Sequence, residues 1–336
     1  MRQALIVAPS WIGDTVLAQP LFARLHELHP GLILDAFAPA WAAPVLKRMR
    51  EVRRVIPNPF SHGEFNLAGR WRAGRELARE DYDAAIVLPN SWKSALLPFF
   101  AGIPQRIGFK GEARHGLLNR IHHYDALELP QLAARYALLA EPVGTGMPAP
   151  LAALRLDVSA DAVRTTLAAL ELAAAPAPVV FCPGAEYGPA KRWPPSHFAE
   201  LARKIAESGR PVWLCGSQKD AAIGDEIVQL SGGACRNLCG RTDLAQAIDL
   251  LSCAHRVVSN DSGLMHIAAA LQRPLVALYG SSSPAYTPPR SAAATVLSLA
   301  LPCSPCFRRE CPLGHFRCMN DLTPAQAFDA MKGMPA

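Results

Sequence analysis

Short apolar runs rich in β-branched residues alternate with amphipathic stretches of helical spacing along most of this chain. In the first half the runs lie at residues 3–8, 32–38, 53–57 and 82–89, with a weaker one at 105–109. The amphipathic stretches lie near residues 15–28, 41–49, 64–79 and 91–101. This alternation predicts parallel strands covered by helices, because a crossover helix returns the chain to the start of the next parallel strand.

The alternation is interrupted once and then resumes. Two Pro, Gly and Ala-rich stretches, EPVGTGMPAP (141–150) and ELAAAPAPV (171–179), flank a helical segment at 159–172 and have the composition of a linker. Further strands are expected at 178–184, 211–216, 255–260, 274–280 and 294–300, and helices at 195–208, 218–231, 243–253, 262–272 and 324–333.

The predicted fold class is therefore α/β, with two Rossmann-like, doubly wound parallel-sheet domains facing across a cleft. We expect an N-terminal domain at 1–158, a C-terminal domain at 159–322 and a terminal helix within 323–336. A length of 336 residues fits two domains of about 150 residues each.

Composition narrows the function classes. Hydrophobic residues make up 50% of the chain and charged residues 18%, which suits a large core. The lack of a known RNA- or DNA-binding motif and an aromatic content of only 7% argue against nucleic acid as a partner. Arginine clusters at 45–55 and 69–79 are either solvated helix faces or a surface for an anionic membrane or substrate.

The expected compartment is the cytoplasm. Residues 1–14 contain one arginine and a five-residue apolar run, which is too short for a signal peptide, and no segment approaches the roughly 20 apolar residues of a membrane span. An odd total of nine cysteines, five of them in expected core segments, agrees with a reducing environment. The protein is expected to contact a membrane peripherally at most.

Polar residues at two strand-to-helix junctions of the first half could bind ligands, because ligands of doubly wound sheets gather at the carboxyl ends of strands. Asp14 follows the first strand, where it either caps a helix, worth about 1 kcal/mol, or acts as a general base. Asn90, Ser91 and Lys93 follow the fourth strand, where they either cap a helix or bind a hydroxyl-rich ligand.

A junction of the second half has the features of a diphosphate site. The stretch at 181–198 leaves a strand through Pro183 and Gly184 and reaches Lys191, so small residues with free N–H groups lie beside a cation. It lacks the P-loop spacing and GxGxxG. The alternative is a solvent-exposed lysine.

The stretch SNDSGLMH, residues 259–266, joins another strand to a helix. Ser262 and Gly263 would leave N–H groups for an anion at the helix start, whereas Asp261 would repel a phosphate and instead accept sugar hydroxyls. An anion site beside a hydroxyl acceptor suits a nucleotide sugar. His266 lies one turn after Ser262, either in the core or on the ligand side.

The segment CSPCFRRECPLGHFRC, residues 303–318, has four closely spaced cysteines: Cys303, Cys306, Cys311 and Cys318. A CxxC pair with two further cysteines is a plausible tetrahedral zinc pattern, although the later spacings match no standard finger. Zinc, disulfides and free thiols therefore stay open.

Five stretches together resemble one family, the bacterial ADP-heptose:lipopolysaccharide heptosyltransferases, which are glycosyltransferases of the two-Rossmann GT-B type. They are SWIGD (10–14), LPNSWKSALLPFFAGIP (88–104), CPGAEYGPAKRWP (182–194), SNDSGLMHIAAAL (259–271) and LYGSSSP (278–284). The resemblance runs from residue 1 to about residue 290, and the cysteine-rich tail departs from it. The motif forms look most like the member that adds the second inner-core heptose.

The resemblance implies an inverting transfer of heptose from ADP-heptose to a Kdo-lipid A acceptor that carries one heptose, with no cofactor and no metal. It implies Asp14 as catalytic base and Lys191 as the residue that stabilises the departing diphosphate. It also implies donor contacts at Gly184, Asp220 (ribose), Thr242 (adenine), Asp261, Ser262, Gly263 and His266, and acceptor contacts at Asn90, Ser91 and Lys93.

Three alternatives stay open. One is another core heptosyltransferase, above all the one that adds the first heptose. Another is a nucleotide-sugar epimerase, which needs acid and base groups on both faces of the sugar, whereas this chain offers one candidate base. A third is a two-lobed solute-binding protein, which would ordinarily carry a signal peptide.

Overall fold

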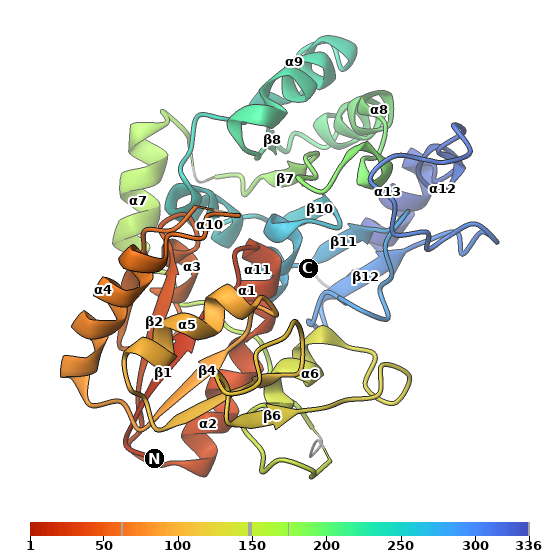
Figure 1. Ribbon diagram of the computed structural model, residues 1–336. Coiled ribbons are helices and arrows are strands. Elements are labelled where there is room, and N and C mark those ends of the chain that lie inside the picture. Colours follow the sequence, from red (N-terminus) through yellow and green to blue (C-terminus); the bar gives the residue numbers. More distant parts are fainter. Residues whose placement is uncertain (62, 147–149, 174, 335–336) are drawn as a thin grey trace. The chain divides into compact units, whose positions relative to one another are not determined.

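The computed structural model describes residues 1–61, 63–146, 150–173 and 175–334 (Figure 1). Its contacts divide the chain into two units, Met1–Ala153 and Leu154–Ala336, against the expected boundary between residues 158 and 159. Parts of the predicted linker, at 147–149 and 174, lie outside the described residues, as do the last two residues of the predicted terminal segment.

The first unit contains a six-stranded parallel sheet with the order β3-β2-β1-β4-β5-β6. Its strands are β1 (Gln3–Val7), β2 (Ile33–Pro39), β3 (Arg54–Asn58), β4 (Ala84–Val87), β5 (Gln105–Phe109) and β6 (Arg120–His122). The strand order reverses between β1 and β4, so the chain leaves these neighbours on opposite sides and a ligand can lie at their carboxyl ends. The first five strands were predicted, and the three-residue β6 was not.

The helices of this unit are α1 (Ile12–Leu17), α2 (Gln19–Leu28), α3 (Ala43–Leu46), α4 (Leu67–Leu77), α5 (Trp92–Phe100) and α6 (Leu132–Leu138), with a 3₁₀ turn at Ala78–Glu80. The single helix expected near 15–28 is two helices that meet at Ala18. Pro20 in the first turn of α2 has no N–H to continue α1, but it suits the start of a new helix.

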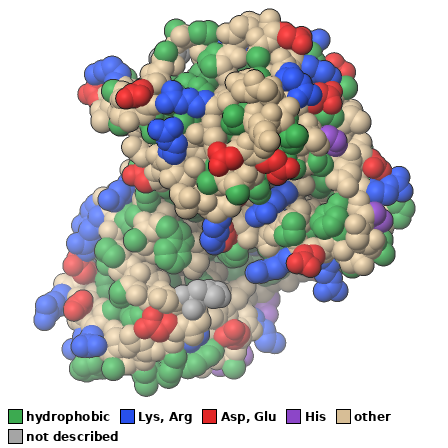
Figure 2. Space-filling model, turned by 90° about the horizontal axis from the view of Figure 1, so that it is seen from above, with side chains coloured by type: hydrophobic (Ala, Val, Ile, Leu, Met, Phe, Trp, Pro, Cys, Tyr) green, Lys and Arg blue, Asp and Glu red, His purple; other side chains and the backbone are tan. Residues whose placement is uncertain are grey.

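Some arginines of both clusters bind other side chains within the first unit. Arg53 and Arg54 bind the fully buried carboxylate of Asp35, with N–O distances of 2.6 and 2.9 Å. Arg70 is buried, and its guanidinium lies 4.3 Å from the ring centre of Phe60. On the face seen in Figure 2, Lys and Arg side chains are interspersed with Asp and Glu. Contact with a membrane stays a prediction.

The second unit repeats the architecture, with the sheet order β12-β11-β10-β7-β8-β9. Its strands are β7 (Val179–Cys182), β8 (Val212–Leu214), β9 (Arg236–Asn237), β10 (Arg256–Asn260), β11 (Leu275–Leu278) and β12 (Ala294–Leu297). Its helices are α7 (Ala160–Ala169), α8 (Pro195–Ala206), α9 (Ala221–Leu230), α10 (Leu244–Ser252), α11 (Gly263–Ala270), α12 (Arg317–Asn320) and α13 (Pro324–Lys332). Here the order reverses between β7 and β10. Among the described residues, no helix combines the length and apolar content that crossing a bilayer requires.

Trp193 holds three segments of the second unit together. Its ring is 1% exposed and packs edge-on against Phe198, with 4.8 Å between ring centres. The indole N–H donates to the carbonyl oxygen of Leu322 at 2.7 Å, and the backbone N–H donates to the side chain of Asn260 at 3.0 Å. Trp193 thus fixes the loop after β7 against the end of β10 and the start of α13.

We expect Trp193→Ala to lower the free energy of unfolding by about 3 to 5 kcal/mol, because it leaves a cavity and removes the indole donor of the Leu322 carbonyl oxygen. Urea titration followed by circular dichroism would measure the change. Trp71→Ala is the matched control, since Trp71 is 53% exposed and its loss should change stability by less than about 0.5 kcal/mol. A similar midpoint for both variants would contradict the bridging role of Trp193.

Candidate active site

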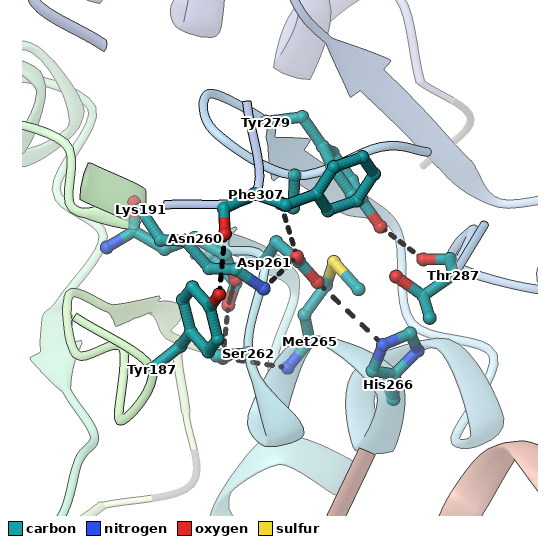
Figure 3. Close-up of polar contacts among 12 residues, drawn as sticks. Tyr187, Lys191, Asn260, Asp261, Ser262, Met265, His266, Tyr279, Thr287 and Phe307 are labelled. Carbon is teal, nitrogen blue, oxygen red and sulfur yellow. Dashed lines mark hydrogen bonds and ion pairs between the residues drawn. The ribbon is translucent and has the colours of Figure 1, made fainter. Parts of the chain in front are cut away.

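Lys191 and Asp261 form an ion pair at the point where the second sheet reverses its order. The Lys191 ammonium donates to Oδ2 of Asp261 at 2.5 Å, and the hydroxyl of Ser282 donates to the same oxygen at 2.5 Å. The Asp261 side chain is 5% exposed and that of Lys191 17%. Figure 3 shows Lys191 from the loop after β7 beside the residues that join β10 to α11. Two donors on Oδ2 leave Oδ1 to accept a further hydrogen bond.

The sequence around Asp261 explains why this junction is rigid. Asn260, the last residue of β10, donates to the carbonyl oxygen of Pro183 at 2.7 Å and so fastens the loop after β7. Ser262 is the N-cap of α11, and its hydroxyl accepts from the N–H of Met265 at 3.4 Å. Gly263 begins the helix, whose first N–H groups have no acceptor within the helix itself. An anion at this position would meet amide donors and the positive end of the helix dipole.

His266 is a buried neutral imidazole behind Asp261. Its ring Nε2 lies 3.9 Å from Oδ1 of Asp261, and its Nδ1 has no hydrogen-bond partner in the described part of the chain. Burial lowers the pKa of His266 to about 4, although Asp261 raises it, and Lys191 lowers it further. His266 therefore carries no charge at neutral pH.

We expect the protein to lose stability as the pH falls from about 6.5 to about 4. The unfolded chain binds a proton at His266 near pH 6.5, whereas the folded protein binds it only near pH 4, so acid favours unfolding by roughly 3 kcal/mol. His266→Gln should flatten the dependence of unfolding free energy on pH in this window. Trp71→Ala is the control, since it removes no titratable group and should leave the slope unchanged. Equal slopes for the wild type and His266→Gln would contradict the assignment.

Gly184 and Asp220 lie in contact on the other side of the loop after β7. A Cβ atom on Gly184 would be 2.4 Å from the Asp220 carboxylate, so only glycine fits there. Asp220 accepts from the N–H and hydroxyl of Ser217 at 2.9 and 2.7 Å, which closes a capping box. The hydroxyl of Thr242 is buried and has no partner among the described residues. The ribose and adenine contacts of Asp220 and Thr242 stay predictions.

The candidate residues of the first unit follow its neighbouring strands β1 and β4. Asp14 lies in the first turn of α1, and the N-cap of that helix is Trp11, so the N-cap interpretation of Asp14 is wrong. Ser91 is the N-cap of α5 but makes no capping hydrogen bond with its side chain. Asn90 accepts from Arg114 at 3.2 Å, and Lys93 donates to the carbonyl oxygen of Gly63 at 2.8 Å.

The family is decided by comparison with known proteins. A family model described as glycosyltransferase family 9 (heptosyltransferase) matches residues 70–317. The chain belongs to glycosyltransferase family 9. Lipopolysaccharide heptosyltransferase 2 of Escherichia coli K12 is 43% identical over 98% of this chain and 97% of the relative.

The solved structure of E. coli ADP-heptose lps heptosyltransferase II is similar with a TM-score of 0.87 at 42% identity, covering 99% of this chain and 98% of that one. The predicted α/β fold class is confirmed. By contrast, lipopolysaccharide heptosyltransferase 1 of Pseudomonas aeruginosa is 27% identical over 92% of this chain and 87% of the relative.

Most of the cysteine-rich tail lies within the part of the chain that the family model matches. The family model extends to residue 317, so the expected limit of the resemblance near residue 290 is wrong. All nine cysteines are free thiols. Cys303, Cys306, Cys311 and Cys318 line a cavity of about 20 Å³ together with Ala190 and Ser281. Within the described residues, no three His, Cys, Asp or Glu side chains are arranged to hold a metal ion.

We expect iodoacetamide at neutral pH to modify Cys311 before any other cysteine of the tail or core. Backbone N–H groups of Phe316, Leu313, His315 and Gly314 lower the pKa of the Cys311 thiol, whereas burial raises that of Cys215. Thiolates are the reactive form. Peptide mapping by mass spectrometry at increasing times would rank the sites, with urea-unfolded protein as the control in which all nine react. Labelling of Cys215 as early as Cys311 would contradict this ranking.

Two residues that contact the candidate site, Ser282 and Arg114, were not predicted from the sequence. Ser282 lies in the family-like stretch LYGSSSP, and its hydroxyl donates to Asp261. A hydroxyl residue in such a stretch, directly after a strand, could have been predicted to contact the site. Arg114 is 1% exposed and donates to the carbonyl oxygens of Phe109 and Pro89 as well as to Asn90. No local pattern marks Arg114, because its role depends on contacts up to 25 residues away.

Proposed function

We propose that this protein is an inverting glycosyltransferase that moves heptose from ADP-heptose to the first heptose of the Kdo-lipid A inner core. The observation that carries the proposal is the Lys191–Asp261 pair beside the start of α11. A nucleotide-diphosphate sugar needs a cation and amide donors for its phosphates and an acceptor for its hydroxyls. This junction offers all three, in a family 9 chain that is 43% identical to a heptosyltransferase 2.

The roles of the donor-site residues follow from the negative charge that develops on the leaving group. Breaking the bond between C1 and the diphosphate develops negative charge on the departing ADP. Lys191 and the amide groups at Ser262 and Gly263 stabilise this charge more strongly than they stabilise the bound donor, which lowers the barrier. Ser282 and Lys191 occupy Oδ2 of Asp261, so its Oδ1 is the oxygen that accepts a heptose hydroxyl.

Acceptor chemistry is assigned to the first unit. Asp14 removes the proton from the attacking hydroxyl, and general-base catalysis of this kind contributes roughly 10² to 10⁴ in rate. Attack from the face opposite the diphosphate inverts the anomeric carbon. Asn90, Ser91 and Lys93, which follow β4, bind the acceptor. Because that acceptor is anchored in a lipid, we assign the protein to the cytoplasmic face of the inner membrane.

A transfer assay with two acceptors tests this proposal. ADP-heptose is offered with Kdo-lipid A that carries either no heptose or one, and the products are weighed by mass spectrometry. Transfer to the mono-heptosylated acceptor alone supports the proposal, and transfer to the heptose-free acceptor would make the protein the enzyme of the first step. An incubation without acceptor distinguishes an epimerase, which would isomerise the sugar.

A further inference from the structure

The tail segment, residues 301–318, forms hydrogen bonds with both loops that supply Lys191 and Ser282. The N–H of Phe307 donates to the carbonyl oxygen of Ser281 at 2.7 Å, in the loop after β11. On the other side, the hydroxyl of Tyr187 donates to the carbonyl oxygen of Phe307 at 2.7 Å (Figure 3). The main chain of the tail segment at Phe307 is therefore held by hydrogen bonds to both loops, through the Tyr187 side chain on one side and the Ser281 backbone on the other.

The main chain of Arg309 lies directly against the loop that carries Lys191. The N–H of Ala190 donates to the carbonyl oxygen of Arg309 at 3.0 Å. A Cβ atom on Gly188 would be 2.5 Å from the same oxygen, and Gly188 has a φ of +153°, so this approach requires glycine. The position of Arg309 beside Lys191 is thus fixed by the backbone.

Tyr187 brings the two cationic side chains to one ring. The Lys191 ammonium lies 5.1 Å and the Arg309 guanidinium 5.4 Å from the ring centre of Tyr187. Aromatic faces attract cations at such distances. The Arg309 side chain is exposed, and the structure gives it no carboxylate partner among the described residues.

Without Arg309, the candidate site has no net positive charge to offset a bound diphosphate. Lys191 is paired with Asp261, so the two together contribute no net charge. A diphosphate carries at least two negative charges, and the amide groups of α11 supply only partial positive charge. Arg309 is a full cation beside the pair, and its planar fork suits bidentate binding of phosphate oxygens.

We propose that Arg309 is a second phosphate-binding residue that holds the donor diphosphate together with Lys191. This inference rests on the proposed function, because it takes a nucleoside diphosphate to bind at Lys191. It also gives the tail segment a role, which is to carry a cation into the donor site.

Calorimetric titration with ADP and with adenosine tests the inference in Arg309→Gln, with Arg308→Gln as the matched control. Arg308 is the neighbouring exposed arginine, and no contact with Tyr187 is found for it in the described chain. Arg309→Gln should raise the Kd for ADP about tenfold, as expected for loss of a charge-assisted hydrogen bond. Its Kd for adenosine should stay within about twofold of the wild type. Arg309→Lys should recover part of the ADP affinity.

Each outcome separates this inference from the proposed function. If the wild type binds ADP and Arg309→Gln binds it equally well, Arg309 is not a phosphate ligand and the proposed function stands. An equal loss in Arg308→Gln, or an equal loss for adenosine, would assign the effect to general charge or loop packing and overturn the inference. If the wild type binds no ADP, the proposed function fails and this inference fails with it.

Discussion

Replacing Lys191 by alanine is expected to lower kcat by about 100- to 1,000-fold and to weaken ADP binding by about tenfold. The loss in rate follows from removing a preorganised cation where charge develops on the leaving group. The loss in affinity follows from removing a charge-assisted hydrogen bond to the diphosphate. Steady-state transfer kinetics and ADP calorimetry would measure the two effects separately.

Stability must be separated from catalysis in this variant. Lys191→Ala leaves the Asp261 carboxylate buried without its cation, which is expected to cost about 3 to 5 kcal/mol of unfolding free energy. Adding Asp261→Asn removes the buried charge, so the double variant should regain stability but not turnover. Lys204→Ala is the control, since Lys204 forms an exposed pair with Glu200 on α8. Normal kcat and unchanged ADP affinity in Lys191→Ala would contradict the proposal that Lys191 binds the donor diphosphate.

The strands were predictable from sequence because both sheets are parallel and buried. Strands such as β7 and β11 are continuous apolar runs, and the helices between the strands keep one apolar face. Short elements were missed because β6, β9 and α12 have two to four residues, too few for a periodic pattern. Residues 15–28 have the apolar spacing of one continuous helix, which hid the break between α1 and α2. Pro20 was the residue that could have predicted this break.

The residue types of the site were predictable, but their pairing was not. Lys191 and Asp261 were each identified at a strand-to-helix junction, yet they are 70 positions apart, and no local pattern shows that they bind one another. The contact between Ala190 and Arg309 likewise depends on the fold. Sequence pattern locates the edge of a sheet where ligands gather, whereas only tertiary packing decides which side chains meet there.

Asp14→Asn is expected to lower kcat by about 10² to 10⁴ and to leave ADP affinity unchanged. Asp14 follows β1, next to the reversal of strand order in the first unit, and lies in the first turn of α1 without serving as its N-cap. Asparagine keeps the size of the side chain but cannot accept a proton from the acceptor hydroxyl, so the chemical step should fail while donor binding in the second unit persists.

The control for Asp14→Asn is Asp161→Asn, which also removes an acid from the first turn of a helix, α7. Favourable interaction with the helix dipole is worth about 0.3 to 1 kcal/mol, so loss of this interaction alone should change stability slightly in both variants. Only the base role predicts that Asp14→Asn loses turnover and that Asp161→Asn does not. A kcat for Asp14→Asn within about threefold of the wild type would return Asp14 to a structural role, because general-base catalysis cannot be so weak.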